Sequence, residues 1–290
     1  MGGARRPFPV STLCFGETVQ EPEATGRRSA KLTFRLFVFF FKNVMFAGKK
    51  LFIFDLDGTL LNSLDIWDRV DVEIIRRVSG VAPDPRELEA FRKAVLREVA
   101  DRKDAYVLYC GAIAKRWNLD IAQEDLHAKR YETAREMLVS AVDWREGAAD
   151  FVRAARTLGF RTAVATTTKR RNVDIYSREN EGMRREGVLY DLFDAVVTRE
   201  DVCAIKPDPE CHRLLAERLG VTADETLVFE DSLIGLDAAK AAGMEVAVID
   251  EPHSDAERAE LNERADFTFR NWPSLQAVLL AECGSHKEVR

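Results

Sequence analysis

Apolar residues recur in two alternating patterns along most of the chain after residue 50. Short unbroken apolar runs indicate buried strands, whereas apolar residues three and four positions apart indicate amphipathic helices. Two of the helical stretches are followed by Gly159 and Gly220, and glycine is the residue that most often ends a helix. The predicted strands are residues 51–54, 162–166, 195–197, 226–229 and 246–249. The predicted helices between them are residues 147–158, 173–185, 209–219 and 234–242.

Residues 64–143 interrupt this alternation. The stretch contains no apolar run of the strand type, and its apolar residues keep helical spacing, as Val70, Ile74 and Val78 do. Pro83 and Pro85 separate the first helix from the second, because proline breaks a helix interior. We therefore predict an insert of about four helices directly after the first strand.

The order of the elements predicts the fold class. Strands and helices that alternate at this spacing are typical of a parallel sheet covered by helices on both faces. We predict an α/β fold, with a doubly wound, Rossmann-like parallel sheet and an inserted all-helical domain. The α/β core is assigned to residues 49–63 and 144–283, the helical domain to residues 64–143 and a tail to residues 284–290.

Residues 1–48 follow neither pattern. Gly, Pro, Arg and Thr are frequent up to Ala30, which predicts disorder. The apolar run at 36–41 is far shorter than the roughly 20 residues that span a bilayer, so we predict no membrane segment. We expect a disordered or non-native N-terminal extension, with Met45 as an alternative start, or a basic organelle-targeting segment.

Charge and cysteine usage narrow the partners and the compartment. The chain of 290 residues carries a net charge of −6, and its first 50 residues, with nine Lys/Arg and three Asp/Glu, carry +6, which leaves −12 for the rest. An acidic body offers no basic face for nucleic acid. The five cysteines are scattered without a Cys-x-x-Cys pair, which is typical of free thiols in a reducing compartment. We therefore expect a cytoplasmic monomer or homodimer, or an organellar one if the basic N-terminus is a targeting segment.

Polar side chains follow the predicted strands, at the edge of the sheet where ligands of doubly wound folds bind. The residues concerned are Asp55, Asp57 and Gly58 after the first strand, Thr166, Thr167, Thr168 and Lys169 after the second, Lys206 after the third, and Glu230, Asp231 and Ser232 after the fourth. Several carboxylates, one lysine and hydroxyl groups are therefore expected to converge at one place.

These residue types fit phosphoryl transfer. Clustered carboxylates raise one another's pKa unless a cation neutralises them, and Mg²⁺ binds oxygen ligands that it shares with phosphate groups. Asp55 could attack phosphorus, and Asp57 could protonate the leaving oxygen and then activate water. Lys206 and the Thr166 hydroxyl could bind the phosphoryl oxygens, while Gly58 allows the sharp turn.

Plainer interpretations of the same residues stay open at this point. Asp55 and Asp57 could be turn residues, Lys206 a solvated loop residue and Thr166 a helix cap. The run from Lys169 to Arg171 could bind a further anion of a substrate, or it could be the solvated first turn of a helix.

Four motifs in this order resemble the haloacid dehalogenase (HAD) superfamily. The insert after the first strand is similar to the branch that contains phosphoglycolate phosphatase and β-phosphoglucomutase. The resemblance covers about residues 49–280. It rests on Asp55-Leu56-Asp57-Gly58-Thr59-Leu60, on Thr166, on Lys206-Pro207-Asp208-Pro209 and on Glu230-Asp231-Ser232 with Gly235.

The resemblance implies a role for each matching residue. Asp55 would be the nucleophile and a metal ligand, and Asp57 the acid–base group that also binds the metal through its backbone carbonyl. Asp231 would complete the Mg²⁺ site, with Glu230 as a direct or indirect partner. The insert would act as a mobile cap. The phosphoryl group would be held by Thr166 and Lys206, together with Gly58 and Thr167.

We therefore predict a Mg²⁺-dependent phosphatase that hydrolyses a small phosphorylated metabolite, a sugar phosphate or a phosphoglycolate-like ester, through an aspartyl-phosphate. Nucleic acids and membranes are not expected as partners. One alternative is a phosphomutase, although the histidine of that branch's first cap helix corresponds here to Trp67. Family dehalogenases usually lack the second aspartate, so Asp57 favours phosphoryl transfer. An alternative of another class is a catalytically silent HAD-fold binding or regulatory protein.

Overall fold

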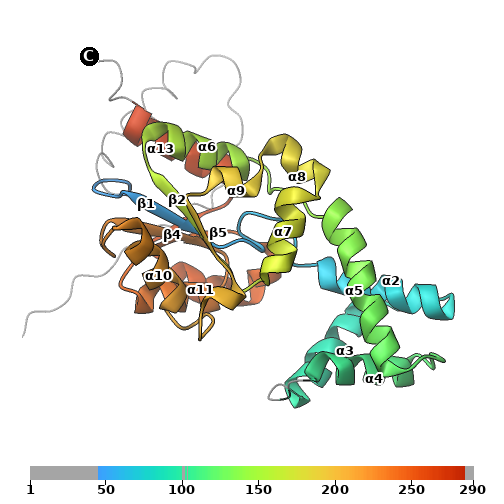
Figure 1. Ribbon diagram of the computed structural model, residues 1–290. Coiled ribbons are helices and arrows are strands. Elements are labelled where there is room, and N and C mark those ends of the chain that lie inside the picture. Colours follow the sequence, from blue (N-terminus) through green and yellow to red (C-terminus); the bar gives the residue numbers. More distant parts are fainter. Residues whose placement is uncertain (1–44, 100–101, 103, 285–290) are drawn as a thin grey trace, which may run out of the picture. The chain divides into compact units, whose positions relative to one another are not determined.

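The computed structural model (Figure 1) describes residues 45–99, 102 and 104–284. The predictions for residues 1–44, and for the tail beyond residue 284, lie outside these ranges. Contacts divide the chain into two compact units. Of the described residues, 45–60, 144–168 and 190–284 form one unit, here the α/β unit, and those within Leu61–Asp143 and Lys169–Leu189 form the other, here the helical unit.

The α/β unit contains one parallel sheet, which confirms the predicted fold class. Its strands lie in the order β3-β2-β1-β4-β5-β6. They are β1 (Leu51–Phe54), β2 (Arg161–Ala165), β3 (Ala195–Val197), β4 (Thr226–Glu230), β5 (Glu245–Ile249) and β6 (Phe267–Phe269). The sequence predicted the first five. It missed β6, because this edge strand has only three residues, all half-buried, and carries no apolar run.

Helices cover both faces of this sheet. Figure 1 shows α6 and α13 on one face and α10 and α11 on the other. The elements of the unit besides the strands are α6 (Ala148–Leu158), α9 (Leu189–Leu192), α10 (Glu210–Leu219), α11 (Leu233–Ala241), α12 (Arg258–Arg264), α13 (Trp272–Cys283) and the 3₁₀ turns η1 (Arg199–Asp201) and η2 (Pro252–Glu257).

The core forms because alternate residues of β1 face opposite sides of the sheet. Leu51 and Ile53 lie in one apolar cluster with residues of α10 and α11. Phe52 and Phe54 contact the rings of Phe151 in α6, and Phe54 also contacts Trp272 in α13. Both sides of β1 are therefore fully buried, which explains its unbroken apolar sequence.

The register of the central strands brings their carboxyl ends level. Phe54 of β1 lies opposite Val164 of β2 and Phe229 of β4. The next residues along the two strands, Asp55 and Glu230, therefore leave the sheet side by side, and the amide of Asp55 still donates to the carbonyl of Phe229 at 2.9 Å. The sheet itself thus positions the acidic residues.

The helical unit is built from amphipathic helices around its own apolar cluster, which includes Ile74, Leu88, Ile113 and Leu126. Its helices are α2 (Ile66–Ser79), α3 (Pro85–Glu98), α4 (Ala105–Arg116), α5 (Gln123–Ser140), α7 (Arg170–Arg178) and α8 (Glu181–Glu186). The first four are the predicted insert. None of the helices within the described part of the chain is both long and apolar enough to cross a membrane.

The single helix predicted over residues 173–185 is wrong, because buried Asn180 divides it into α7 and α8. The Asn180 side chain accepts a hydrogen bond from the amide of Met183 and so caps α8. Its amide group also donates to the carbonyls of Leu138 and Val142. Residues 169–189, assigned from the sequence to the core, thereby belong to the helical unit by their contacts.

Candidate active site

Lys206 joins the ends of two neighbouring strands. Its ammonium donates to Oδ1 of Asp55 at 2.6 Å and to Oε1 of Glu230 at 2.5 Å. The lysine side chain is only 4% exposed, so it is not a solvated loop residue. Asp55 follows β1, Glu230 ends β4 and Lys206 comes from the loop after β3, as the strand order predicted.

Asp55, Glu230 and Asp231 form a compact carboxylate cluster. One oxygen from each residue lies within 4.8 Å of the others, and Glu230 and Asp231 are buried. The Asp57 carboxylate is not part of this group, and its predicted contact to a metal is through the backbone carbonyl instead. The structure therefore brings together the carboxylates of three of the predicted metal ligands.

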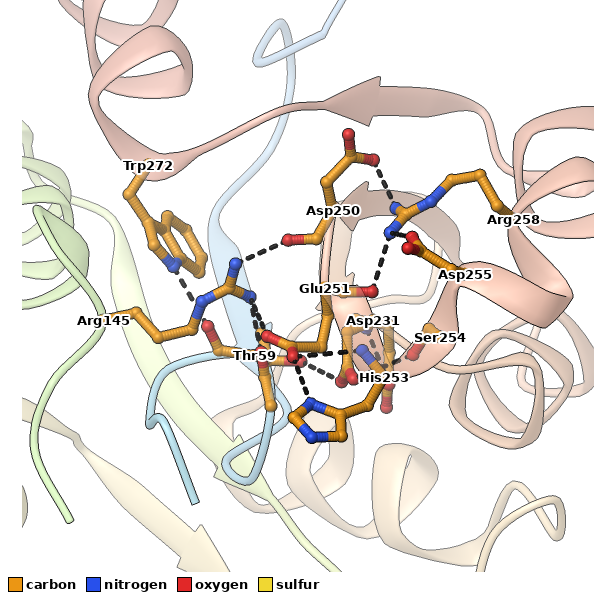
Figure 2. A network of polar contacts seen from close by, with 12 residues as sticks. Thr59, Arg145, Asp231, Asp250, Glu251, His253, Ser254, Asp255, Arg258 and Trp272 are labelled. Carbon is orange, nitrogen blue, oxygen red and sulfur yellow. Dashed lines mark hydrogen bonds and ion pairs between the residues drawn. The ribbon is translucent and has the colours of Figure 1, made fainter. Parts of the chain in front are cut away.

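Hydrogen bonds orient Asp231 within the cluster. The Thr59 hydroxyl donates to its Oδ1 at 2.7 Å, and the Ser254 hydroxyl lies 3.4 Å from its Oδ2 (Figure 2). Thr59 belongs to the turn that follows β1, so this turn and the end of β4 are fastened together next to the carboxylates.

Burial and mutual repulsion disfavour the ionised carboxylates. Burial raises the pKa of Asp55 well above its ordinary value; Lys206 opposes this rise, whereas Glu230 and Asp231 add to it. Burial, followed by the charge of Glu230, raises the pKa of Asp231 to about 7. Burial lowers the pKa of Lys206, but the charges of Asp55 and Glu230 outweigh it and raise that pKa overall, so the ammonium keeps its proton.

The cluster fits a hard divalent cation. Three carboxylates face one ammonium group, which leaves excess negative charge among buried groups. All the available donor atoms are oxygens, the ligand type that Mg²⁺ and Ca²⁺ take in proteins. A bound cation would remove the repulsion that raises the pKa of Asp55 and Asp231.

The loop after β2 lies next to Asp57. Thr166 is buried, and its hydroxyl accepts a hydrogen bond from the amide of Thr168 at 3.0 Å. The Thr168 hydroxyl donates to Oδ2 of Asp57. Thr167, predicted to bind phosphate, is exposed. The sequence assigned no role to Thr168, because within a run of three threonines nothing distinguishes the one that reaches Asp57.

Two glycines allow the chain to approach itself closely. Gly58 has a φ of +89°, in the left-handed region that favours glycine, which agrees with the expected sharp turn. At Gly235, a Cβ atom would lie 1.9 Å from the carboxyl carbon of Glu230. Because Glu230 is fully buried and paired with Lys206, it cannot move aside, and only glycine fits there.

Sequence reasoning missed several residues that fix this site from a distance. Arg145 donates to the carbonyl of Gly58, and the indole of Trp272 donates to the carbonyl of Thr59 (Figure 2). These partners lie 87 and 213 positions apart in the sequence. No local pattern marks such pairs. Thr59 stands two positions after Asp57 in the quoted motif, and this place was the available signal for its contact with the carboxylate cluster.

Comparisons with known proteins agree with this geometry. The family model for haloacid dehalogenase-like hydrolases matches residues 49–243. A phosphorylated carbohydrates phosphatase from Thermotoga maritima is 32% identical over 193 residues, covering 67% of this chain and 81% of the relative. The fructose-1-phosphate phosphatase YqaB from Escherichia coli is 28% identical over 193 residues, covering 67% and 92% of the two chains.

The fold is shared with solved structures. A crystal structure of CbbY from Rhodobacter sphaeroides in complex with phosphate has a TM-score of 0.54 and 25% sequence identity, and the match covers 78% of this chain and 96% of that one. The match to the family model alone spans more than half of the chain. The chain is therefore an enzyme that belongs to the haloacid dehalogenase-like hydrolases, as the four motifs predicted, and it is a phosphoric monoester hydrolase.

Proposed function

We propose that this protein is a Mg²⁺-dependent phosphatase that hydrolyses a phosphorylated carbohydrate through an aspartyl-phosphate on Asp55. The observation that carries the proposal is the bridge from Lys206 to both Asp55 and Glu230 inside a carboxylate cluster with excess negative charge. A structural ion pair would be balanced. An excess of buried negative charge is expected at a site that binds a cation together with a reacting phosphate.

The first step is attack by the Asp55 carboxylate on phosphorus. Lys206 holds one oxygen of this carboxylate, which fixes the direction of the other. As the bond from Asp55 to phosphorus forms, the bond from phosphorus to the sugar oxygen breaks, and Asp57 donates its proton to that oxygen. The hydrogen bond from the Thr168 hydroxyl to Oδ2 orients the Asp57 carboxyl for this proton transfer.

The second step reverses the role of Asp57. Its carboxylate takes a proton from water while the water oxygen attacks phosphorus, and the bond from phosphorus to Asp55 breaks, which releases phosphate and restores the enzyme. Asp55, Asp231 and Glu230, with the backbone of Asp57, would hold the cation. When bound, this cation would stabilise negative charge on the phosphoryl oxygens. Lys206 and Thr166 would bind further phosphoryl oxygens.

The substrate class follows from the relatives rather than from the site. Two relatives are named for phosphorylated carbohydrates and for fructose 1-phosphate, so a sugar phosphate is the proposed substrate, with a phosphoglycolate-like ester as the second choice. Hydrolysis is favoured over a mutase reaction. In the helical unit Trp67 carries no acid–base group, and the guanidinium carbon of Arg130 lies 4.6 Å from its ring centroid.

We also propose a cellular location and an assembly state. The four cysteines among the described residues, Cys110, Cys203, Cys211 and Cys283, are free thiols, in agreement with a reducing compartment such as the cytoplasm. A monomer or a homodimer is expected.

The experiment is a hydrolysis assay of the purified chain against a panel of sugar phosphates, phosphoglycolate and a generic aryl phosphate, with Mg²⁺ present and inorganic phosphate as the readout. We expect release from at least one sugar phosphate and complete loss of release when a chelator is added. Release that survives chelation would rule out the metal site, and a chain that hydrolyses no ester on the panel would be the silent alternative.

A further inference from the structure

Three successive carbonyl groups of the turn after β1 are each held by a donor from elsewhere in the α/β unit. The Gly58 carbonyl accepts from Nη1 of Arg145 at 2.5 Å, and the Thr59 carbonyl accepts from the Trp272 indole at 3.0 Å. The Leu60 carbonyl accepts from the backbone amide of Arg145 at 2.8 Å. Arg145 therefore supplies two of the three donors, one from its side chain and one from its backbone.

The same guanidinium also reaches the chain that follows β5. Its Nη2 donates to the carbonyl of Asp250 at 2.5 Å, and its Nη1 lies 3.4 Å from the carboxylate of Glu251. Figure 2 shows the Arg145 guanidinium between the Thr59 turn and Asp250 with Glu251. The side chains of Arg145 and Glu251 are only 16% and 10% exposed, so water competes little for these contacts.

The chain after β5 leads back to the carboxylate cluster. Arg258 donates to the carbonyl of Glu251 at 2.7 Å, which holds the start of η2. The hydroxyl of Ser254, within η2, contacts Oδ2 of Asp231. Arg145 thus joins the turn that carries Asp57 to the segment that contacts Asp231.

Only arginine can make this junction. Its planar fork presents several N–H groups in fixed directions, whereas a lysine ammonium is a single point that reaches one acceptor well. The need is greatest at Gly58, because a residue without Cβ has the largest conformational freedom, and a fixed carbonyl removes that freedom. Gly58 directly follows Asp57, so fixing the Gly58 carbonyl limits the motion of the backbone from which the Asp57 side chain extends.

We propose that Arg145 is a positioning residue of the reaction. Its side-chain contacts among the described residues are to Gly58, Asp250 and Glu251, and not to Asp55, Glu230 or Asp231. It fixes the Gly58 peptide against the carbonyl of Asp250, and so holds Asp57 in the direction in which its proton reaches the leaving oxygen. The expected effect of Arg145 on the reaction rate rests on the proposed phosphatase function, whereas its expected effect on the turn after β1 does not.

The experiment compares Arg145→Ala and Arg145→Lys with Arg156→Ala. Arg156 is a matched control from the same unit, because its guanidinium contacts Thr162 at the start of β2 and Asp194, away from the strand ends that carry the site. We expect kcat of Arg145→Ala to fall about 100-fold with KM changed less than about threefold, since misplacing a reacting group by about 1 Å has this effect. Low guanidinium chloride should restore part of the rate, with sodium chloride as the ionic-strength control.

Arg145→Lys tests whether the reaction needs the several contacts of the arginine or only its positive charge. It keeps the charge but reaches one carbonyl only, so it should fold and still lose most of the rate. If Arg145→Ala does not fold, this variant decides the question. A wild-type rate in Arg145→Lys, or a parallel fall in Arg156→Ala, would overturn the proposal.

Hydrogen–deuterium exchange of the peptide that spans residues 55–61 gives a readout independent of activity. We expect exchange there to be about 10-fold faster in Arg145→Ala, to slow again with guanidinium, and to be unchanged in Arg156→Ala. Unchanged exchange in Arg145→Ala would overturn the inference even in an active enzyme. If the wild type hydrolyses no phosphate ester, the proposed function fails while the exchange still decides whether Arg145 holds the turn.

Discussion

Each unit of this protein buries a cluster of charges, and the two clusters differ in their balance. In the helical unit, Asp71 and Arg130, 0% and 2% exposed, form an ion pair with Nη2 of Arg130 3.2 Å from Oδ2 of Asp71. The hydroxyl of Tyr109 donates to the same carboxylate at 2.9 Å. One negative charge meets one positive charge, and each carboxylate oxygen has a donor.

The cluster of the α/β unit is not balanced in this way. Asp55, Glu230 and Asp231 share the single ammonium of Lys206. Burial, and after it the charge of the neighbouring carboxylates, raises the pKa of Asp55 and of Asp231. Burial of charge alone therefore does not mark a functional site. A balanced cluster of charges stabilises its unit, whereas a cluster with excess negative charge can bind a cation.

Substituting one aspartate in each cluster by its neutral isostere should have opposite effects on stability. Asp71→Asn leaves the buried guanidinium of Arg130 without its counter-charge, and we expect the free energy of unfolding to fall by about 3–5 kcal/mol. Asp55→Asn removes a charge that the fold disfavours, so the melting temperature of the metal-free protein should rise. Thermal and urea denaturation in the presence of a chelator measure both.

Activity provides the second half of this contrast. Folded Asp71→Asn should keep most of its kcat, whereas Asp55→Asn should lose about four orders of magnitude or more because its nucleophile is gone. The distinction between the clusters would be broken if Asp55→Asn destabilised the metal-free protein as much as Asp71→Asn does.

The pH dependence of stability should sharpen the contrast further. The pKa of Asp231 is about 7 in the folded protein and ordinarily 3.8. Between these values the folded state binds more protons than the unfolded state, so the free energy of unfolding of the metal-free protein should fall as the pH rises from about 4 to about 7, by a few kcal/mol at most. The stabilisation that Mg²⁺ adds should therefore be larger at about pH 8 than at about pH 5.

The measurement is the difference in melting temperature between protein with Mg²⁺ and protein with chelator at each pH, which cancels the other titrating groups. Asp231→Asn is the control and should flatten the dependence. An Mg²⁺ effect of equal size at both pH values would contradict the assignment of the cation to this cluster.

The sequence was sufficient to predict the parts of the site that follow from strand order. A recognisable apolar strand comes before or ends at each of four site residues, Asp55, Lys206, Glu230 and Asp231. Parallel pairing must bring such positions to one edge of the sheet. Arg145 and Trp272 were not predictable in this way, because their contacts to the turn depend on how a helix start and a distant C-terminal helix pack.

The buried ion pair of the helical unit was hidden for a different reason. Hydrophobic periodicity locates the buried face of a helix by its apolar residues, and a charged residue on that face looks like an exception to the pattern. Asp71 next to Val70, and Arg130 one turn after Leu126, give no sign that they meet. Asn180 caps the start of α8 and also donates to carbonyls of another segment, and no local pattern encodes those contacts.

Trapping the phosphorylated enzyme tests the central claim most directly. Asp57→Asn removes the group that activates water, so after incubation with Mg²⁺ and an aryl phosphate, whose leaving group needs little protonation, the variant should accumulate protein heavier by one phosphoryl group. Peptide mass spectrometry should place that group on Asp55, hydroxylamine should remove it, and the Asp55→Asn, Asp57→Asn double variant should show none. The account would be contradicted if the wild type turns over the substrate but the Asp57→Asn variant carries no phosphoryl group, or carries it on another residue.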